Sequence, residues 1–149
     1  MIENNEIDTL LIEDDPAEAD LTLRAFRKRQ LINSIKVLSD GEEAVQFLLR
    51  KGPYEGAEFP SSLKLILLDL KLPKLNGFEV LQAIRNDERA KRIPVVILTS
   101  SQEDPDIQKA YALGANSYVV KPVNFDNFSK CVSDLGMYWM FLKDRKSVV

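Results

Sequence analysis

Short apolar runs alternate along the chain with segments whose apolar residues recur at helical spacing. The runs, each of a length typical of a β-strand, cover residues 9–12, 35–38, 65–68, 94–98 and 118–120. The third run is apolar at every position, which is typical of a strand buried on both faces in the middle of a parallel sheet. The fourth is rich in β-branched residues, which favour strands.

A segment with helical spacing follows each run. Helices are expected from Pro16 into the basic run 27–29, over 42–50, over 78–86, from Asp104 to Gly114, and from Asn124 as far as Lys143. Asp15 and Pro16 suit the N-cap and the first helical position, and Glu18 completes a start resembling a capping box.

The alternation of strand and helix predicts an α/β fold with a doubly wound parallel sheet and helices on both faces. With 149 residues, the chain is expected to form one domain, residues 1–149, with no output domain after it. Residues 52–62 contain two prolines and two glycines and are long for a helix-to-strand connection, so we expect an exposed loop there.

Composition excludes several classes of function. The net charge of −3 disfavours binding to nucleic acid. The absence of histidine removes Ser-His-Asp catalysis and His-ligated zinc, and the single cysteine, Cys131, allows no intramolecular disulfide. No apolar run has the length of a membrane span and residues 1–9 do not resemble a signal peptide, so a cytoplasmic protein without membrane contact is expected.

Chemically distinct side chains stand where four of the predicted strands end. They are Glu13 and Asp14 after the first run, Asp69 after the third, Thr99 after the fourth and Lys121 after the fifth. Each alone has an ordinary structural explanation, such as a helix cap, a polar loop or a solvated lysine. In a doubly wound sheet, however, the carboxyl ends of these strands converge on one crevice, where ligands bind.

The combination has a coherent chemistry. Clustered carboxylates repel one another unless a cation neutralises them, and oxygen ligands with room for water suit Mg²⁺. Asp69 could then attack phosphorus as a nucleophile and form an acyl phosphate. Lys121 offers a positive charge to the same phosphoryl group, and Thr99 offers a hydroxyl donor.

Four motifs together resemble the receiver domain of bacterial two-component response regulators, in the CheY-like superfamily. They are Leu-Leu-Ile-Glu-Asp-Asp, Leu-Leu-Asp-Leu-Lys-Leu-Pro with Asn-Gly, Val-Ile-Leu-Thr-Ser, and Gly-Ala-Asn-Ser-Tyr-Val-Val-Lys-Pro. The resemblance covers nearly the whole chain. It implies a flavodoxin-like five-stranded sheet of order 2-1-3-4-5 and a protein that takes part in phosphorelay signal transduction without being an enzyme in the usual sense.

The resemblance also implies roles for individual residues. Asp69 would be the phosphoacceptor. Asp14 would bind Mg²⁺ (or Mn²⁺) directly, Glu13 through water, and Lys71 through its backbone carbonyl. Lys121 would contact the phosphoryl group and precede proline in a cis peptide bond. Catalysis of phosphotransfer and of slow dephosphorylation would be the domain's own.

Thr99 and Tyr118 would form the switch pair, which changes the surface of the fourth helix, fifth strand and fifth helix after phosphorylation. The chain departs from the commonest family pattern at two positions. Glu13 replaces the more usual aspartate, which would loosen the outer metal shell. Lys71 stands where its side chain could approach the attacking water, so the lifetime of the phosphorylated form stays open.

The last predicted helix carries an apolar stripe that continues into an end that is apolar all round. The stripe comprises Phe125, Phe128, Val132, Leu135, Trp139 and Leu142. Two interpretations stay open: a helix end folded over the base of the domain, or a homodimer interface through Met137, Tyr138 and Phe141.

The loop at 52–62 and the Tyr138-Trp139 ending are similar to those of the stand-alone, dimeric regulators paired with cyanobacterial phytochrome kinases. That resemblance implies a sensor histidine kinase, a phytochrome, as phosphoryl donor. The downstream protein stays unknown.

Three other functions compete with this interpretation. A pseudo-receiver scaffold would not need Asp14, Asp69, Thr99 or Lys121. A phosphatase similar to the haloacid dehalogenases would need an aspartate where Lys71 stands. A flavodoxin-like cofactor binder would need a glycine-rich phosphate loop in place of three acids.

Overall fold

Five parallel strands form the centre of the computed structural model, which describes residues 7–29, 34–100 and 104–136. The strands pair in the order β2-β1-β3-β4-β5, which confirms the expected flavodoxin-like sheet. They are β1 (Thr9–Ile12), β2 (Ile35–Leu38), β3 (Leu65–Asp69), β4 (Val95–Thr99) and β5 (Ser117–Val120).

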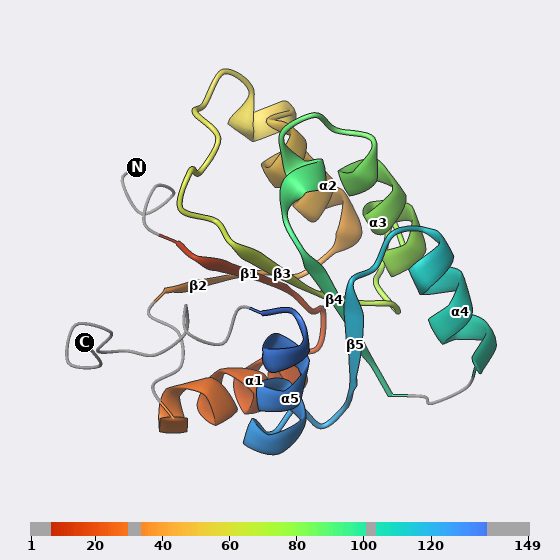
Figure 1. The fold of residues 1–149 in the computed structure, drawn as a ribbon. Coiled ribbons are helices and arrows are strands. Elements are labelled where there is room, and N and C mark those ends of the chain that lie inside the picture. Colours follow the sequence, from red (N-terminus) through yellow and green to blue (C-terminus); the bar gives the residue numbers. More distant parts are fainter. Residues whose placement is uncertain (1–6, 30–33, 101–103, 137–149) are drawn as a thin grey trace.

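Helices cover both faces of this sheet (Figure 1). On one face lie α1 (Pro16–Arg29) and α5 (Phe125–Asp134), and on the other lie α2 (Gly41–Leu49), α3 (Gly77–Arg85) and α4 (Asp104–Ala112). Two short 3₁₀ helices, η2 (Gly52–Tyr54) and η3 (Ala90–Arg92), lie in the connections before β3 and β4. Among the described residues, no helix is long and apolar enough to cross a membrane.

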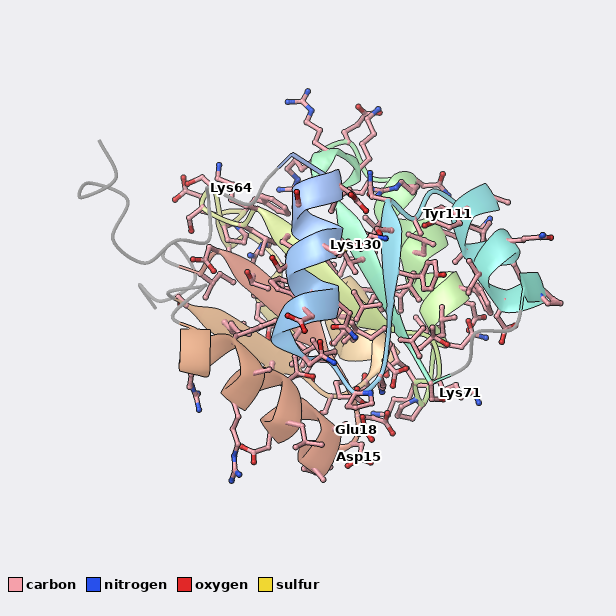
Figure 2. The ribbon with its side chains drawn as sticks, turned by 60° about the horizontal axis from the view of Figure 1, so that its bottom comes forward. Asp15, Glu18, Lys64, Lys71, Tyr111 and Lys130 are labelled. Atoms are coloured by element: carbon pink, nitrogen blue, oxygen red, sulfur yellow. The ribbon has the colours of Figure 1, made fainter. Side chains whose placement is uncertain are left out.

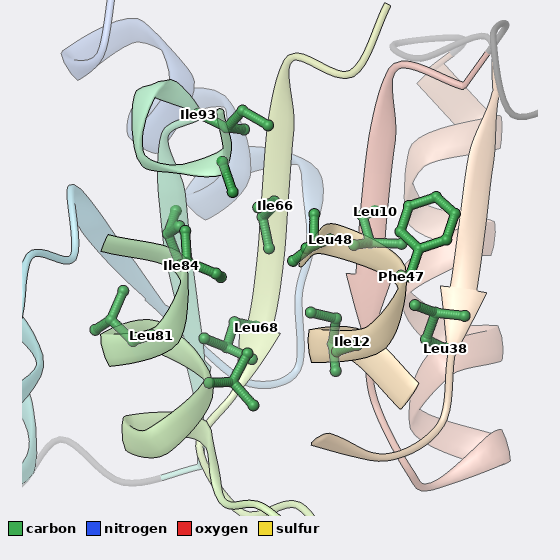
Figure 3. Close-up of a cluster of buried hydrophobic side chains, with 14 of the residues drawn as sticks. Leu10, Ile12, Leu38, Phe47, Leu48, Ile66, Leu68, Leu81, Ile84 and Ile93 are labelled. Atoms are coloured by element: carbon green, nitrogen blue, oxygen red, sulfur yellow. The ribbon is translucent and has the colours of Figure 1, made fainter. Parts of the chain in front are cut away.

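Side chains of the central strands alternate between two hydrophobic cores, because successive residues of a strand point to opposite faces. On β3, Ile66 and Leu68 pack under α2 and α3 (Figure 3), whereas Leu65 and Leu67 pack under α1 and α5. The central strands are buried on both sides, which explains why their sequences show no polar alternation.

The register of the strands brings their carboxyl ends to one edge. Ile12 pairs with Leu68, Asp69 with Leu98, and Thr99 with Val120. The residues that follow these positions therefore meet at the same end of the sheet, as the sequence predicted.

The prediction that the last helix reaches Lys143 was wrong in its length. Helix α5 ends at Asp134, and Gly136 adopts a left-handed conformation with φ +71°. A glycine in this conformation commonly ends a helix, because it pays no Cβ penalty there. The proposed dimer residues Met137, Tyr138 and Phe141 lie outside the described residues.

Smaller differences concern element boundaries. The exposed connection at 52–62 begins with the short helix η2, and β4 runs from Val95 to Thr99 rather than from 94 to 98. Such shifts of one residue are usual at element ends, where the hydrophobic pattern is weakest.

Candidate functional site

Three carboxylates gather at the carboxyl edge of the sheet. One oxygen each from Glu13, Asp14 and Asp69 lies within 4.8 Å of the others. The backbone places them there because Glu13 and Asp14 directly follow β1 and Asp69 ends β3, the neighbouring strand. Glu13 and Asp69 are buried, whereas Asp14 is exposed, so the cluster opens to solvent on one side.

Lys121, which directly follows β5, reaches across this edge and contacts two of the carboxylates. Its Nζ lies 2.6 Å from Glu13 Oε1 and 3.2 Å from Asp69 Oδ2. Its backbone N–H donates to the Thr99 carbonyl over 2.8 Å, which fixes the lysine backbone beside the end of β4. The Lys121-Pro122 peptide bond is cis, as expected.

Burial has the largest effect on the electrostatics of this cluster. Burial, partly opposed by the hydrogen bond from Lys121 and aided by the nearby Asp69 carboxylate, raises the pKa of Glu13 to about 7. Burial alone would lower the pKa of Lys121, but its two carboxylate partners outweigh that effect and raise it. Lys121 therefore stays charged and holds two acids together that would otherwise repel.

The loop after β3 shapes the surroundings of Asp69. The Lys71 N–H donates to Asp69 Oδ1 over 3.3 Å, which brings the Lys71 backbone beside the carboxylate. The chain then turns back, and the Gly77 N–H donates to the Leu70 carbonyl over 2.8 Å. A Cβ at Gly77 would lie 2.5 Å from the Asp69 carbonyl oxygen, so only glycine fits this close approach.

Thr99 and Tyr118, the expected switch pair, lie in different environments. Thr99 is buried at the end of β4 beside the Lys121 backbone. Tyr118 on β5 is 37% exposed and forms an edge-to-face pair with Tyr111 of α4, the ring centroids being 6.3 Å apart. The tyrosine thus lies outside, on the face shared by α4 and β5.

Glu18 belongs to the site, although the sequence assigned it only to a helix cap. Asp15 Oδ1 accepts from the N–H of Ala17 and, over 3.4 Å, from that of Glu18, as an N-cap should. The Asp15 N–H, however, donates to Glu13 Oε2, and Glu18 Oε1 lies 3.8 Å from Lys121 Nζ. The capping box is only half formed, because the Glu18 carboxylate lies near Lys121 instead of the Asp15 N–H.

Figure 2 shows Asp15, Glu18 and Lys71 at the same edge of the molecule.

The donor set fits a hard divalent cation. Glu13, Asp14 and Asp69 with Lys121 carry a formal charge of −2, from three carboxylates and one ammonium group. Carboxylate oxygens on an edge open to water are the ligands that Mg²⁺ and Mn²⁺ accept. The Lys71 N–H lies against Asp69 Oδ1, and the ligand role expected of the Lys71 carbonyl stays a prediction.

A comparison with known protein families decides the class. The model of the response regulator receiver domain matches residues 9–133. The chain belongs to the response regulator receiver family. The match includes β1 and β5 and all the side chains of the site.

Two curated relatives are similar over most of their length. The "Probable methanogenesis regulatory protein FilR2" of Methanothrix harundinacea is 41% identical over 132 residues, which cover 88% of this chain and 82% of that protein. "Response regulator Rcp1" of a Synechocystis strain is 37% identical over 131 residues, which cover 88% of this chain and 87% of that protein.

Solved receiver structures agree with the fold. The "Bacteriophytochrome response regulator RtBRR" superposes with a TM-score of 0.79 at 47% identity, covering 89% of this chain and 80% of that one. The "Mn(2+)-bound form of response regulator Rcp1" superposes with a TM-score of 0.70 at 37% identity, covering 89% and 94%. The receiver fold and the relation to regulators of phytochromes are thus confirmed, which removes support from the phosphatase and cofactor-binder alternatives.

Proposed function

We propose that this receiver domain is a phosphorylation switch whose acceptor is Asp69. The observation that carries the proposal is the placement of the Asp69 carboxylate, buried at the end of the central strand, 3.2 Å from the ammonium group of Lys121. A carboxylate beside a fixed cation is suited to attack phosphorus, because the cation stabilises the negative charge of the incoming phosphoryl group.

The reaction is a transfer of a phosphoryl group from a phosphohistidine. An Asp69 oxygen attacks phosphorus and forms the O–P bond while the P–N bond breaks. The electron pair of that bond goes to the imidazole nitrogen, which takes up a proton. Lys121 stabilises the negative charge on the phosphoryl oxygens, and Thr99 would donate its hydroxyl hydrogen to one of them.

Asp14, an Asp69 oxygen and the Lys71 carbonyl would hold a divalent cation, Mg²⁺ or Mn²⁺, and Glu13 would act on it through water. When bound, the metal neutralises the carboxylates and the phosphoryl charge, as Lewis acids do in phosphoryl transfer. The donor chemistry of the carboxylate cluster and the name of the Mn²⁺-bound Rcp1 structure support this assignment. The protein's own groups thereby promote both its phosphorylation and its slow dephosphorylation, and it acts on no separate substrate.

The signal would leave the site through Thr99 and Tyr118. A phosphoryl group on Asp69 gives Thr99 a new acceptor, and movement of Thr99 makes room for the Tyr118 ring to turn inward. That movement would break the edge-to-face pair with Tyr111 and change the surface of α4, β5 and α5. The negative charge of the phosphoryl group would thus shift the balance between the outward and the inward position of the Tyr118 ring.

The donor we propose is a sensor histidine kinase of the phytochrome class. The name of the bacteriophytochrome response regulator RtBRR, to which the chain is 47% identical, supports this choice. FilR2, which is 41% identical, is named as a probable regulator of methanogenesis and not of a phytochrome pathway. The competing possibility is a phosphoryl donor from another class of sensor kinase.

The relation to phytochrome regulators also supports a single receiver domain that acts in the cytoplasm as a homodimer. Such a protein would pass on its signal through contact with another protein. Residues 137–149 hold the proposed dimer contacts Met137, Tyr138 and Phe141. Light scattering measures the molar mass in solution, and hence the oligomeric state, of the full chain and of a Tyr138→Ala, Phe141→Ala variant. Equal mass for both, at the value of one chain, would contradict the dimer.

Phosphotransfer from kinases tests the proposed function. A purified phytochrome histidine kinase and an unrelated histidine kinase, each loaded with radiolabelled phosphate, are mixed with the receiver and Mg²⁺. We expect rapid loss of label from the phytochrome kinase, slow loss from the other, and no loss to an Asp69→Asn variant.

The outcomes separate the two parts of the proposal. Faster transfer from the unrelated kinase would overturn the phytochrome assignment but keep the phosphorylation switch. No transfer from either kinase and none from acetyl phosphate, with the receiver folded, would favour the pseudo-receiver scaffold instead.

A further inference from the structure

A hollow lies at the opposite edge of the sheet, around the amino ends of β3 and β4. It has a volume of about 590 Å³ and is lined by the connection after η2 and by the segment around η3. Phe59, Pro60, Leu63, Ile93 and Pro94 supply apolar walls. Figure 2 shows Lys64, on the rim of this pocket, far from the edge that carries Glu18 and Lys71.

The polar side chains of this pocket are mainly cationic. Lys64, Arg89 and Arg92 line it, and within the described part of the chain none of them forms an ion pair with a carboxylate. The single acidic residue of the lining, Glu88, is paired with Lys91 over 3.0 Å. All three are exposed, so together they put positive charge on the rim of one hollow, on a chain whose net charge is −3.

A fourth cation stands behind the Phe59 wall. Arg50 is only 6% exposed, and its three guanidinium nitrogens have no hydrogen-bond acceptor among the residues that the structure covers. The guanidinium carbon lies 4.6 Å from the ring centroid of Phe47 and 5.9 Å from that of Phe59, on which Arg89 also stacks at 5.3 Å. The aromatic rings stabilise the buried charge but do not neutralise it.

The cations repel one another. The pKa of Arg50 is lowered, first by burial and then by the charge of Arg89. Clustered like charges cost free energy unless a counter-charge is bound, just as the carboxylates at the other edge require a cation. An anion in the pocket would offset this repulsion.

We propose that this pocket binds a small organic anion, with a phosphate, phosphonate or carboxylate head on an apolar body. The head would lie against Lys64, Arg89 and Arg92, and the body against Phe59, Leu63 and Pro94. The volume is that of a small-molecule site, whereas a protein segment would need an extended groove. The inference does not depend on phosphorylation of Asp69.

Amide NMR titration of the full chain in metal-free buffer tests the proposal with three probes. Phenylphosphonate has both head and body and cannot transfer a phosphoryl group; inorganic phosphate has only the head, and benzyl alcohol only the body. We expect saturable shifts from phenylphosphonate at residues 59–64 and 88–94, at least about tenfold tighter than from either other probe.

Variants locate the binding. Arg92→Glu reverses a charge of the rim, and Ser61→Trp fills the pocket without changing charge; each should weaken phenylphosphonate about tenfold or more. Lys130→Glu reverses an exposed charge on α5 and should leave the affinity unchanged, as should Asp69→Asn. The amide spectrum of each free variant shows whether it is folded.

Several results would overturn the proposal. They are the absence of saturable shifts with phenylphosphonate, equal binding of inorganic phosphate, or binding that survives in both Arg92→Glu and Ser61→Trp. Shifts from a hexaglutamate peptide but none from phenylphosphonate would instead assign the pocket to an acidic protein segment.

Discussion

Lys121 Nζ lies 2.6 Å from Glu13 Oε1, in a contact that joins the end of β5 to the end of β1. Both side chains are mostly buried, so the lysine offsets a carboxylate that water reaches poorly. The same ammonium group also contacts Asp69, so the cation proposed for the phosphoryl group is in place before phosphorylation.

The first prediction concerns the dependence of stability on pH. The Glu13 carboxyl has a pKa of about 7 in the folded chain against 4.5 as its ordinary value. Between these values the folded state binds a proton that the unfolded state lacks, so the free energy of unfolding falls as pH rises and levels off above about pH 7. Without metal, we expect a loss of roughly 2 to 3 kcal/mol across this window in urea unfolding.

A Glu13→Gln variant is the control for this titration. Its unfolding free energy should lack the decline between pH 5 and 7, since glutamine does not titrate. Saturating Mg²⁺ should reduce the decline in the parent, because the metal binds the ionised carboxylate of the folded state. An identical pH profile for parent and variant would show that another group titrates.

The second prediction concerns Glu18, whose carboxylate lies 3.8 Å from Lys121 at the open side of the site. Replacing it by glutamine removes a negative charge near an anionic phosphoryl donor and frees Lys121 from a competing partner. We expect phosphorylation by acetyl phosphate to become about two- to fivefold faster, a modest effect because Glu18 is partly exposed.

Asp20→Asn is the matched control for Glu18→Gln. It also removes one negative charge from α1, but Asp20 pairs with Arg24 over 2.9 Å instead of with Lys121. If both variants change the rate equally, general charge explains the effect and Glu18 has no specific role at the site.

The third prediction concerns the switch. In a protein labelled with 3-fluorotyrosine, phosphorylation should shift the fluorine resonances of Tyr118 and Tyr111, because their edge-to-face contact breaks. A Thr99→Ala variant should still gain a phosphoryl group, but with a much smaller shift. Full shifts without the Thr99 hydroxyl would exclude Thr99 as the link between Asp69 and Tyr118.

The fourth prediction concerns Gly77. An alanine there would place Cβ 2.5 Å from both the Asp69 carbonyl oxygen and Leu70 Cα, and backbone atoms in this buried turn have little room to move. We expect Gly77→Ala to lower the free energy of unfolding by about 2 to 4 kcal/mol. Gly56→Ala meets no atom within 4 Å and suffers only from its φ of +83°, so it should cost about 1 kcal/mol. An equal decrease in the free energy of unfolding for both variants would show that the steric contact at Gly77 is not destabilising.

The sheet could be predicted from the sequence because its signal is local. Runs such as 65–68 are apolar at every position, which is typical of a strand covered on both faces. The alternation of these runs with helices then leaves few topologies. The end of α5 could not be predicted in the same way. The apolar spacing continues past Gly136, and the left-handed conformation of that glycine outweighs the pattern.

Most of the candidate site was also predictable, because strand ends meet at one edge in any doubly wound sheet. Glu18 was not, since its spacing from Asp15 fits a helix cap and its contact with Lys121 joins residues far apart in the sequence. Arg50 was missed for the same reason: it lies at the end of a helix, and only the folded chain brings it beside Phe59 and Arg89.

The central claim is that the phosphoryl group is carried by Asp69, and reduction of the phosphorylated protein with sodium borohydride tests it directly. An aspartyl phosphate is an acyl phosphate, so borohydride converts that aspartate to homoserine, which peptide mass spectrometry locates. We predict homoserine at position 69 after treatment with acetyl phosphate and Mg²⁺, and none without Mg²⁺. Homoserine at Asp14 or another acid, or a phosphoryl group that borohydride does not remove, would contradict the claim.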